Sequence, residues 1–298
     1  WAFGTISLVL SKHQLNPNIF NLYKNLIGFS FLLVILVVSS FLTSENFWII
    51  NYESFFLIIL SGVLGSGLAD QIYIRSLSLI GSNIISVIAS SLSMFVLIFA
   101  LILNLFFPSF FPKQAWPPAN LEILGFMLII SAIILSSWKK NDYKNTKFQY
   151  IALAVSAFML MGLSANLTNS AIFLNTGTTL NIMSIILIRF IPAIIFQCCI
   201  LMVTKTTKME LKSFFTLPSK SIYYAILGSL MISVIAIFFW TAGMKLESNN
   251  VTLFSLLAQT SNIMIFICSW LILKEKISSQ KILGIILSFI GIILIVSS

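Results

Sequence analysis

Apolar residues run along the chain in about ten long stretches, separated by short segments that hold most of the polar and turn-forming residues. Each stretch is on the order of 20 residues, the length that an α-helix needs to cross the hydrocarbon layer of a bilayer. The stretches are continuous rather than alternating, which favours helices over membrane-spanning strands. A helix also satisfies its backbone amides within its own segment, as lipid requires. We therefore predict an all-α polytopic membrane protein with ten transmembrane helices.

Pro, Asn, Gly and Ser mark most of the turns between the predicted helices. The helices are expected at residues 1–13, 19–42, 53–74, 81–106, 120–138, 148–172, 178–203, 221–244, 249–273 and 278–297. The first stretch is short and the chain starts at Trp1 without Met, so we expect the first helix to be incomplete in this sequence.

Composition supports this fold class and excludes others. Only 8% of the 298 residues are charged, whereas soluble domains carry about 25%. The net charge of +9 comes from lysines in short loops, where they act as topology signals, and no basic run resembles a nucleic-acid site. The cysteines, Cys198, Cys199 and Cys268, lie within apolar stretches without metal-ligand spacing, so we expect packing roles for them. Neither a metal nor a cofactor is expected.

The two halves of the chain resemble each other. The sequence LEILG at 121–125 parallels QKILG at 280–284, and residues 73–99 align with residues 240–266. The helix that begins near Lys24 corresponds to the one that holds Arg189. These matches occur in the same order along the chain and together predict an internal repeat.

Five helices in each half is an odd number, so the two repeats must enter the membrane from opposite sides. We predict a first five-helix repeat at 1–138, a Lys-rich linker at 139–147 and a second five-helix repeat at 148–298. Inverted repeats of this kind enclose a central cavity with the substrate site near the midplane of the bilayer.

Lysines accumulate on one predicted face of the membrane. The loops after the odd-numbered helices hold Lys12, Lys139, Lys140, Lys144, Lys147, Lys205, Lys208, Lys212, Lys220, Lys274, Lys276 and Lys281. The opposite loops hold Lys113 and Lys245. The positive-inside rule predicts that the Lys-rich face is cytoplasmic and that both termini face outward, most simply in a cell (plasma) membrane.

Several short motifs occur in a recognisable order. They are WAFG at 1–4 with Lys12 and Pro17, GVLGSGLAD at 62–70, YIRSL at 73–77 and WLILKE at 270–275, followed by Gly284 and Gly291. In this order the chain resembles the EamA-type ten-helix branch of the drug/metabolite transporter superfamily, over nearly its whole length. The resemblance implies export or exchange of amino acids, related metabolites or drugs through a central cavity by alternating access.

The chain departs from the family pattern at several positions. The fourth and ninth helices carry Ser93-Met94 and Thr260-Ser261 where the family often has a proline, and Lys24 stands where an arginine is usual. These differences leave the fold unaffected but do not allow a particular substrate to be carried over.

Asp70 is the only carboxylate placed well inside a predicted helix. It could bind a substrate ammonium group or a coupling proton. It could equally pair with Arg75 or lie at the interface. Lys24 and Arg189, also within helices, could contact a substrate carboxylate or act as gates; the alternative is that they extend to the lipid headgroups.

Uncharged polar and aromatic side chains provide further candidates. Asn166 and Asn169 lie in a polar cluster of the sixth helix, and Gln259 and Asn262 lie in a run of four polar residues in the ninth. Such residues either bond neighbouring helices or line a cavity. Tyr73 and Trp240 occupy matching positions in the two repeats and could stack on an apolar or cationic substrate.

Small residues predict where helices pack closely. Gly62 and Gly65 allow the third helix to approach its neighbours or to bend. Gly125, Gly284 and Gly291 place small residues on one face of the fifth and tenth helices, which are expected to pack against each other.

These features favour a secondary transporter of small metabolites, with protons as possible coupling ions and the lipid bilayer as its surroundings. A nucleotide-sugar or sugar-phosphate carrier of the same superfamily is the alternative, although it would need several cations in its cavity. An intramembrane enzyme has less support, because His13 is the only histidine and no nucleophile elbow or metal spacing occurs. No nucleotide-binding motif for ATP-driven transport is present.

Overall fold

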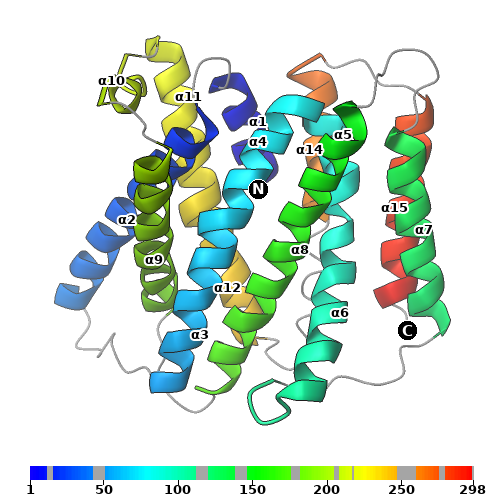
Figure 1. Ribbon diagram of the computed structural model, residues 1–298, viewed down its shortest axis with the longest axis horizontal. Helices are drawn as coiled ribbons and strands as arrows, with labels where there is room; N and C mark the ends of the chain where they lie inside the picture. Colours follow the sequence, from blue (N-terminus) through cyan, green and yellow to red (C-terminus); the bar gives the residue numbers. More distant parts are fainter. Residues whose placement is uncertain are drawn as a thin grey trace.

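The computed structural model describes residues 1–11, 16–42, 51–111, 120–137, 146–175, 182–204, 208–216, 218–246, 260–274 and 279–296, and every regular element within these ranges is a helix (Figure 1). The first half contains α1 (Ala2–Ser11), α2 (Pro17–Leu42), α3 (Tyr52–Gly62), η1 (Val63–Ala69), α4 (Asp70–Ile80), α5 (Ser82–Ala89), α6 (Ser91–Phe106) and α7 (Asn120–Ser137). The second half contains α8 (Thr146–Phe173), α9 (Ile182–Val203), α10 (Lys208–Lys212), α11 (Ser219–Leu230), η2 (Met231–Ala236), α12 (Ile237–Leu246), α14 (Thr260–Leu271) and α15 (Ser279–Val296).

Six helical segments of the described residues are long and apolar enough to cross a membrane. They are Pro17–Phe41, Tyr52–Ile80, Ile84–Phe106, Phe148–Phe173, Ile182–Val203 and Ser219–Leu246. Four further apolar stretches, in α1, α7, α14 and α15, have 10 to 17 described residues, fewer than the roughly 20 that a full crossing requires. The structure therefore confirms a helical membrane protein. Its described residues include six helices of full spanning length, where the sequence predicts ten.

Large apolar side chains cover the outside of the helices. On α2 alone, Val34 is 62% and Phe41 is 86% exposed. A water-soluble protein does not present an apolar surface of this extent, so lipid is the natural environment of these faces. The chain is an integral membrane protein.

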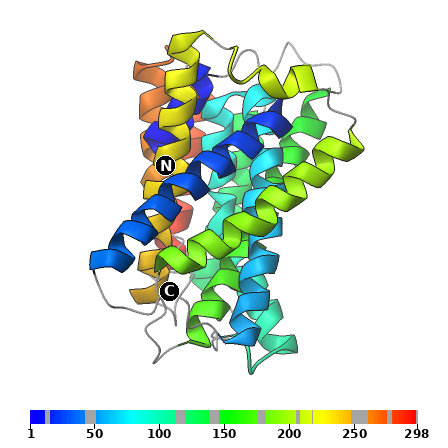
Figure 2. The ribbon, with the colours of Figure 1, turned by 90° about the vertical axis from the view of Figure 1, so that its left-hand side faces the viewer.

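The helices form a bundle with a pair at each side. α2 and α9 lie side by side, inclined to the helices behind them, at one side of the molecule (Figure 2). α7 and α15 pack against each other at the opposite side (Figure 1). Between these pairs, α8 packs against α3, α4 and α6, and α1 packs against α11 and α14. The buried core, which includes Ile58, Val96, Ile185 and Trp240, joins α3, α6, α9 and α12.

Two of the long helices each contain a π-helical segment near the middle of their length. η1 lies between α3 and α4, and η2 lies between α11 and α12. The wider π turn shifts the backbone hydrogen bonds out of the α-helical register and is common at functional sites. Both segments lie in the interior of the bundle, where Gly65, Ser66 and Ser233 are buried.

The contact between α7 and α15 depends on small residues. Gly125, Gly284 and Gly291 are all buried. A Cβ atom on Gly291 would lie 2.6 Å from the carbonyl oxygen of Gly125 and 3.0 Å from the side chain of Ile129. Since a backbone atom cannot move aside cheaply, a side chain at Gly291 would push the two helices apart.

We predict that Gly291→Ala destabilises the protein by about 1–3 kcal/mol through overpacking. The measurement is the thermal unfolding midpoint of the detergent-purified protein. Ile290→Ala, one residue earlier at a 42% exposed position, is the control and should change the midpoint little. Equal midpoints for the two variants would show that α7 and α15 do not meet at this glycine.

Candidate functional site

A cavity lies in the middle of the bundle. The space open to the centres of water molecules is about 130 Å³, on the order of ten times what one water needs. Residues from α1, α2, η1, α4, α5, α6, α8, α9, η2, α12 and α14 line it. Its charged and polar side chains, among the described residues, are Trp1, Thr5, Lys24, Ser66, Asp70, Tyr73, Ser164, Arg189, Trp240, Ser261 and Asn262. The cavity thus lies between the two halves of the chain.

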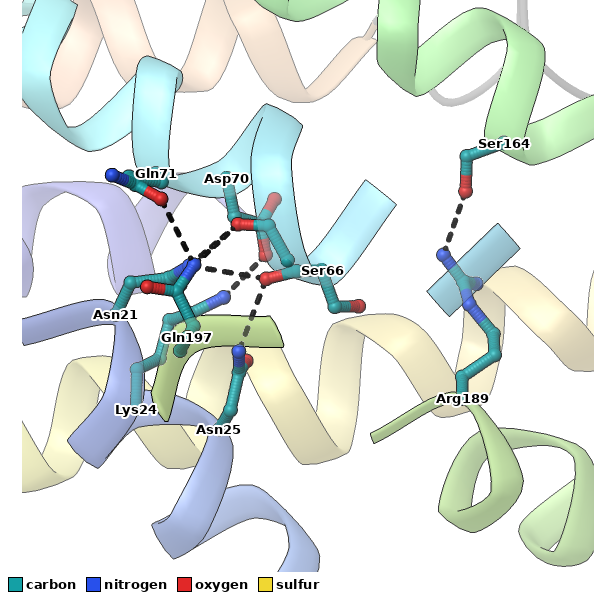
Figure 3. Close-up of polar contacts among 10 residues, drawn as sticks. Asn21, Lys24, Asn25, Ser66, Asp70, Gln71, Ser164, Arg189 and Gln197 are labelled. Carbon is teal, nitrogen blue, oxygen red and sulfur yellow. Dashed lines mark hydrogen bonds and ion pairs between the residues drawn. The ribbon is translucent and has the colours of Figure 1, made fainter. Parts of the chain in front are cut away.

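Lys24 of α2 and Asp70 at the start of α4 form an ion pair at the cavity (Figure 3). The Lys24 side chain is 2% exposed and the Asp70 side chain 20% exposed. A buried ammonium group is costly unless a partner compensates it, so each side chain makes the burial of the other tolerable. Arg75, the alternative partner that the sequence offers for Asp70, is instead exposed at the surface.

The π-helical segment η1 is held by side-chain amides from two other helices (Figure 3). Asn21 donates to the carbonyl oxygens of Ser66 at 3.1 Å and Gly67 at 3.0 Å, and Asn25 donates to Ser66 at 3.0 Å. Gln197 of α9 donates to the Gly67 carbonyl at 2.6 Å. Backbone carbonyls outside the α-helical pattern need partners in a membrane interior, and these three amides provide them.

These amides are functional neighbours that sequence reasoning missed. Asn21 and Asn25 are one helical turn apart and flank Lys24, so their spacing places all three on adjoining positions of α2. That spacing is the signal that could have identified them. Gln197 also donates to Gln71 at 3.1 Å, which extends the polar contacts from α9 to α4.

Arg189 of α9 also lines the cavity. Its side chain is 8% exposed, and its Nη2 donates to the hydroxyl of Ser164 at 3.1 Å. The Nε–H group has no hydrogen-bond partner. Among the described residues, no carboxylate lies within 4.0 Å of the guanidinium. Arg189 is therefore a buried cation with a single neutral acceptor.

Gly62 and Gly65 make room for Arg189. A Cβ atom on Gly62 would lie 2.3 Å from the carbonyl oxygen of Arg189. One on Gly65 would lie 2.3 Å from Ser164 Oγ and 2.9 Å from Arg189 Nη2. The two glycines therefore let the backbone of this helix touch α9 and let the guanidinium pass over η1 to Ser164.

Aromatic side chains form part of the cavity wall. The hydroxyl of Tyr73 lies 3.2 Å from Thr5 Oγ1, and its ring meets Phe158 edge-on with centroids 5.8 Å apart. Trp240 is 7% exposed and meets the ring of Trp1 edge-on at 5.2 Å. Both residues thus present ring surface to the cavity while other rings fix their orientation.

Residues 150–297 match the EamA-like transporter family. The chain belongs to this family. The EamA-like family is part of the drug/metabolite transporter superfamily, so the relationship expected from the sequence motifs is confirmed, and with it a membrane transporter. No curated protein matches the chain.

The fold of this EamA-family chain also occurs in solved structures. One crystal structure of a protein superimposes with a TM-score of 0.61, covering 98% of this chain and 92% of that chain, at 11% sequence identity. The similarity at that identity concerns the fold alone. It extends over both halves of the chain, including the half outside the family match.

The structure brings most of the sequence-derived candidates of this EamA-family chain to one place. Lys24, Asp70, Tyr73, Arg189, Trp240 and Asn262 all line the cavity. Gln259 lies outside the described residues.

Asn166 and Asn169 are buried and are not among the described residues that line the cavity. Asn166 donates to the carbonyls of Val96 at 2.9 Å and Gly162 at 3.0 Å, so its amide joins α8 to α6 instead of facing the cavity.

The ion pair predicts a specific pattern of stabilities. Lys24→Met or Asp70→Leu alone leaves a buried charge uncompensated, so each should cost about 3–5 kcal/mol. The double variant removes both charges and should be markedly more stable than the sum of the single losses implies. The thermal unfolding midpoints of the four purified proteins test this, and strictly additive losses would contradict a coupled pair.

The glycine contacts predict a contrast within one helix. Gly62→Ala places its Cβ against the backbone of α9 and should cost about 1–3 kcal/mol. Gly67→Ala is the matched control, because its Cβ would lie 3.0 Å from a ring atom of Phe196, and a side chain can turn away. Thermal unfolding midpoints compare the two. A larger loss for Gly67→Ala would show that α3 does not approach α9 at Gly62.

Proposed function

We propose that the chain is a secondary transporter that moves a small metabolite through the central cavity by alternating access. The observation that carries the proposal is the cavity itself, which holds three charged side chains in the interior of an apolar bundle. Ionisable groups within membrane helices are expensive and usually belong to solute or ion pathways. Membership of a transporter family supports the same conclusion, and favours transport over catalysis.

We further propose that the four shorter apolar helices complete a ten-helix, two-repeat plan. The alignment of residue 73 with residue 240 also sets η1 against η2, so the π-helical segments correspond. Helix contacts occur in matching pairs. The contact of α1 with α11 corresponds to that of α8 with α3, and the contact of α2 with α11 corresponds to that of α9 with α3. Corresponding helices also pack on each other, as α2 does with α9 and α7 with α15. This is the pattern that a pseudo-twofold axis between two inverted halves produces.

The cavity gives little support to a nucleotide-sugar or sugar-phosphate carrier. Such substrates carry two or more negative charges, and the described residues of the cavity wall include two cations, Lys24 and Arg189. Lys24 is already paired with Asp70. A substrate with a net charge of at most one, drawn from the amino acids, related metabolites or drugs, fits this arrangement better.

Transport into proteoliposomes tests this function. A panel of amino acids, organic acids, drugs and nucleotide sugars should include at least one small solute that is taken up by protein-containing vesicles but not by empty ones. Uptake of nucleotide sugars alone would favour the alternative carrier, and no uptake of any class would contradict transport by this chain.

Proton coupling through Asp70 makes a separate prediction. Asp70→Asn cannot exchange a proton at this position, so uptake driven by a pH gradient should fall at least tenfold. Solute exchange without a gradient should persist, which shows that the variant is folded. Full gradient-driven uptake by Asp70→Asn would contradict a coupling role for this carboxylate.

We propose that the face with α10 and the start of α11 is cytoplasmic and that the membrane is the cell membrane. These segments, which include Lys208, Lys212 and Lys220, lie at one end of the bundle (Figure 1), in agreement with the positive-inside rule. A cysteine introduced by Asn145→Cys, in the Lys-rich linker, should react with a membrane-impermeant maleimide only after the cells are opened. Labelling in intact cells would reverse the orientation.

A further inference from the structure

We infer that the cavity holds its substrate through one anionic group bound at Arg189, and that it therefore selects singly charged anions over zwitterions and cations. The inference concerns substrate binding. Its relevance to transport rests on the proposed function.

The first argument is the charge balance of the cavity. Its charged side chains are Lys24, Asp70 and Arg189. Lys24 and Asp70 neutralise each other, so within the described part of the wall one positive charge remains, that of Arg189. A buried charge is strongly disfavoured unless an opposite charge compensates it. A ligand with one negative charge would therefore compensate the charge of Arg189 best.

The second argument is the incomplete hydrogen bonding of Arg189. An arginine has five N–H donors in a planar fork, and the described residues satisfy one of them, at Ser164. The Ser164 hydroxyl donates its own hydrogen bond to the carbonyl of Ser61 at 2.9 Å, so toward Arg189 it acts only as a neutral acceptor. The Nε–H group, in a side chain that is 8% exposed, has no partner. A carboxylate satisfies such a fork with two parallel hydrogen bonds.

The third argument concerns the selectivity against positively charged groups. Asp70, the only carboxylate among the described residues of the cavity wall, is occupied by Lys24. A substrate ammonium group could reach Asp70 only by displacing Lys24, which is 2% exposed and would remain buried without compensation. A zwitterion therefore gains its carboxylate contact but finds no place for its cation.

The rest of the wall defines the uncharged part of the ligand. Leu92, Phe158, Ile237, Trp240 and Ile265 surround the space with apolar surface. The volume accommodates on the order of ten non-hydrogen atoms, if each occupies the space of about one water. The ligand class is a small amphipathic monoanion with a compact hydrocarbon body.

Four six-carbon probes of nearly equal size test the inference: hexanoate, hexanamide, 2-aminohexanoate and hexylamine. Binding is measured by the intrinsic tryptophan fluorescence of the detergent-purified protein, since Trp1 and Trp240 border the cavity, with protein-free micelles as the blank. Hexanoate should bind at least tenfold more tightly than hexanamide and 2-aminohexanoate, and hexylamine least. Equal binding of hexanoate and hexanamide, or tighter binding of hexylamine, would overturn the inference without any variant.

Variants then locate the charge. Arg189→Gln keeps hydrogen-bonding capacity but removes the charge, and should bring hexanoate down to the affinity of hexanamide. Arg189→Lys should retain part of the preference. Arg75→Gln removes an exposed arginine outside the cavity and is the matched control, with no change expected. An undiminished hexanoate preference in Arg189→Gln would show that the anion binds elsewhere.

Failure of this inference can be separated from failure of the proposed function. If hexanoate shows the expected preference but no solute is transported, the anion site stands and the transport function is wrong. If a cation or a zwitterion is transported equally well by the unmodified protein and by Arg189→Gln, transport stands and the anion site at Arg189 is wrong.

Discussion

Charges and backbone carbonyls that are buried between apolar helices have no water to bind, so each must find a partner on another helix. This constraint governs the centre of the molecule. Lys24 and Asp70 compensate each other across α2 and α4, and the carbonyls of the π-helical segment η1 accept hydrogen bonds from Asn21, Asn25 and Gln197. These contacts hold together α2, α9 and the long helix that contains η1 and α4. The glycines beside it serve the same end, because they allow α9 to come close enough for these contacts.

Arg189 is the place where compensation is incomplete, and that gives the cavity its chemical character. The Arg189 side chain is buried, and among the described residues its guanidinium donates a hydrogen bond only to the hydroxyl of Ser164. Lys24 and Asp70 line the cavity, but because they pair with each other they add no net charge to it. Among its described residues, the partly aromatic cavity then has one uncompensated charge. A solute of the opposite sign would compensate it, as Asp70 compensates Lys24.

The membrane class and most of the helix positions could be predicted from sequence, because the length of an apolar stretch and the turn residues beside it are local properties. The choice of Asp70, Lys24 and Arg189 as candidates was equally accessible, since charges in apolar helices stand out. Their partners were not. Lys24 and Asp70 are 46 residues apart in sequence, and Arg75 was the nearer cation. For Asn166 the sequence left two alternatives open, because whether a polar side chain faces a neighbouring helix or a cavity depends on the rotation of its helix. The amides of α2 and α9 bind carbonyls of the π-helical segment η1, and no simple sequence pattern predicts such a segment.

The most direct test of the uncompensated charge at Arg189 is an experimental structure with a heavy-atom carboxylate bound. Crystals grown with 6-bromohexanoate should show an anomalous bromine peak inside the cavity, against the apolar wall near Trp240 and Ile237. The carboxylate density should lie within hydrogen-bond distance of the Arg189 guanidinium, with the Lys24–Asp70 pair intact. A carboxylate bound to Lys24 in place of Asp70, or bromine found only outside the cavity, would contradict this view of the site.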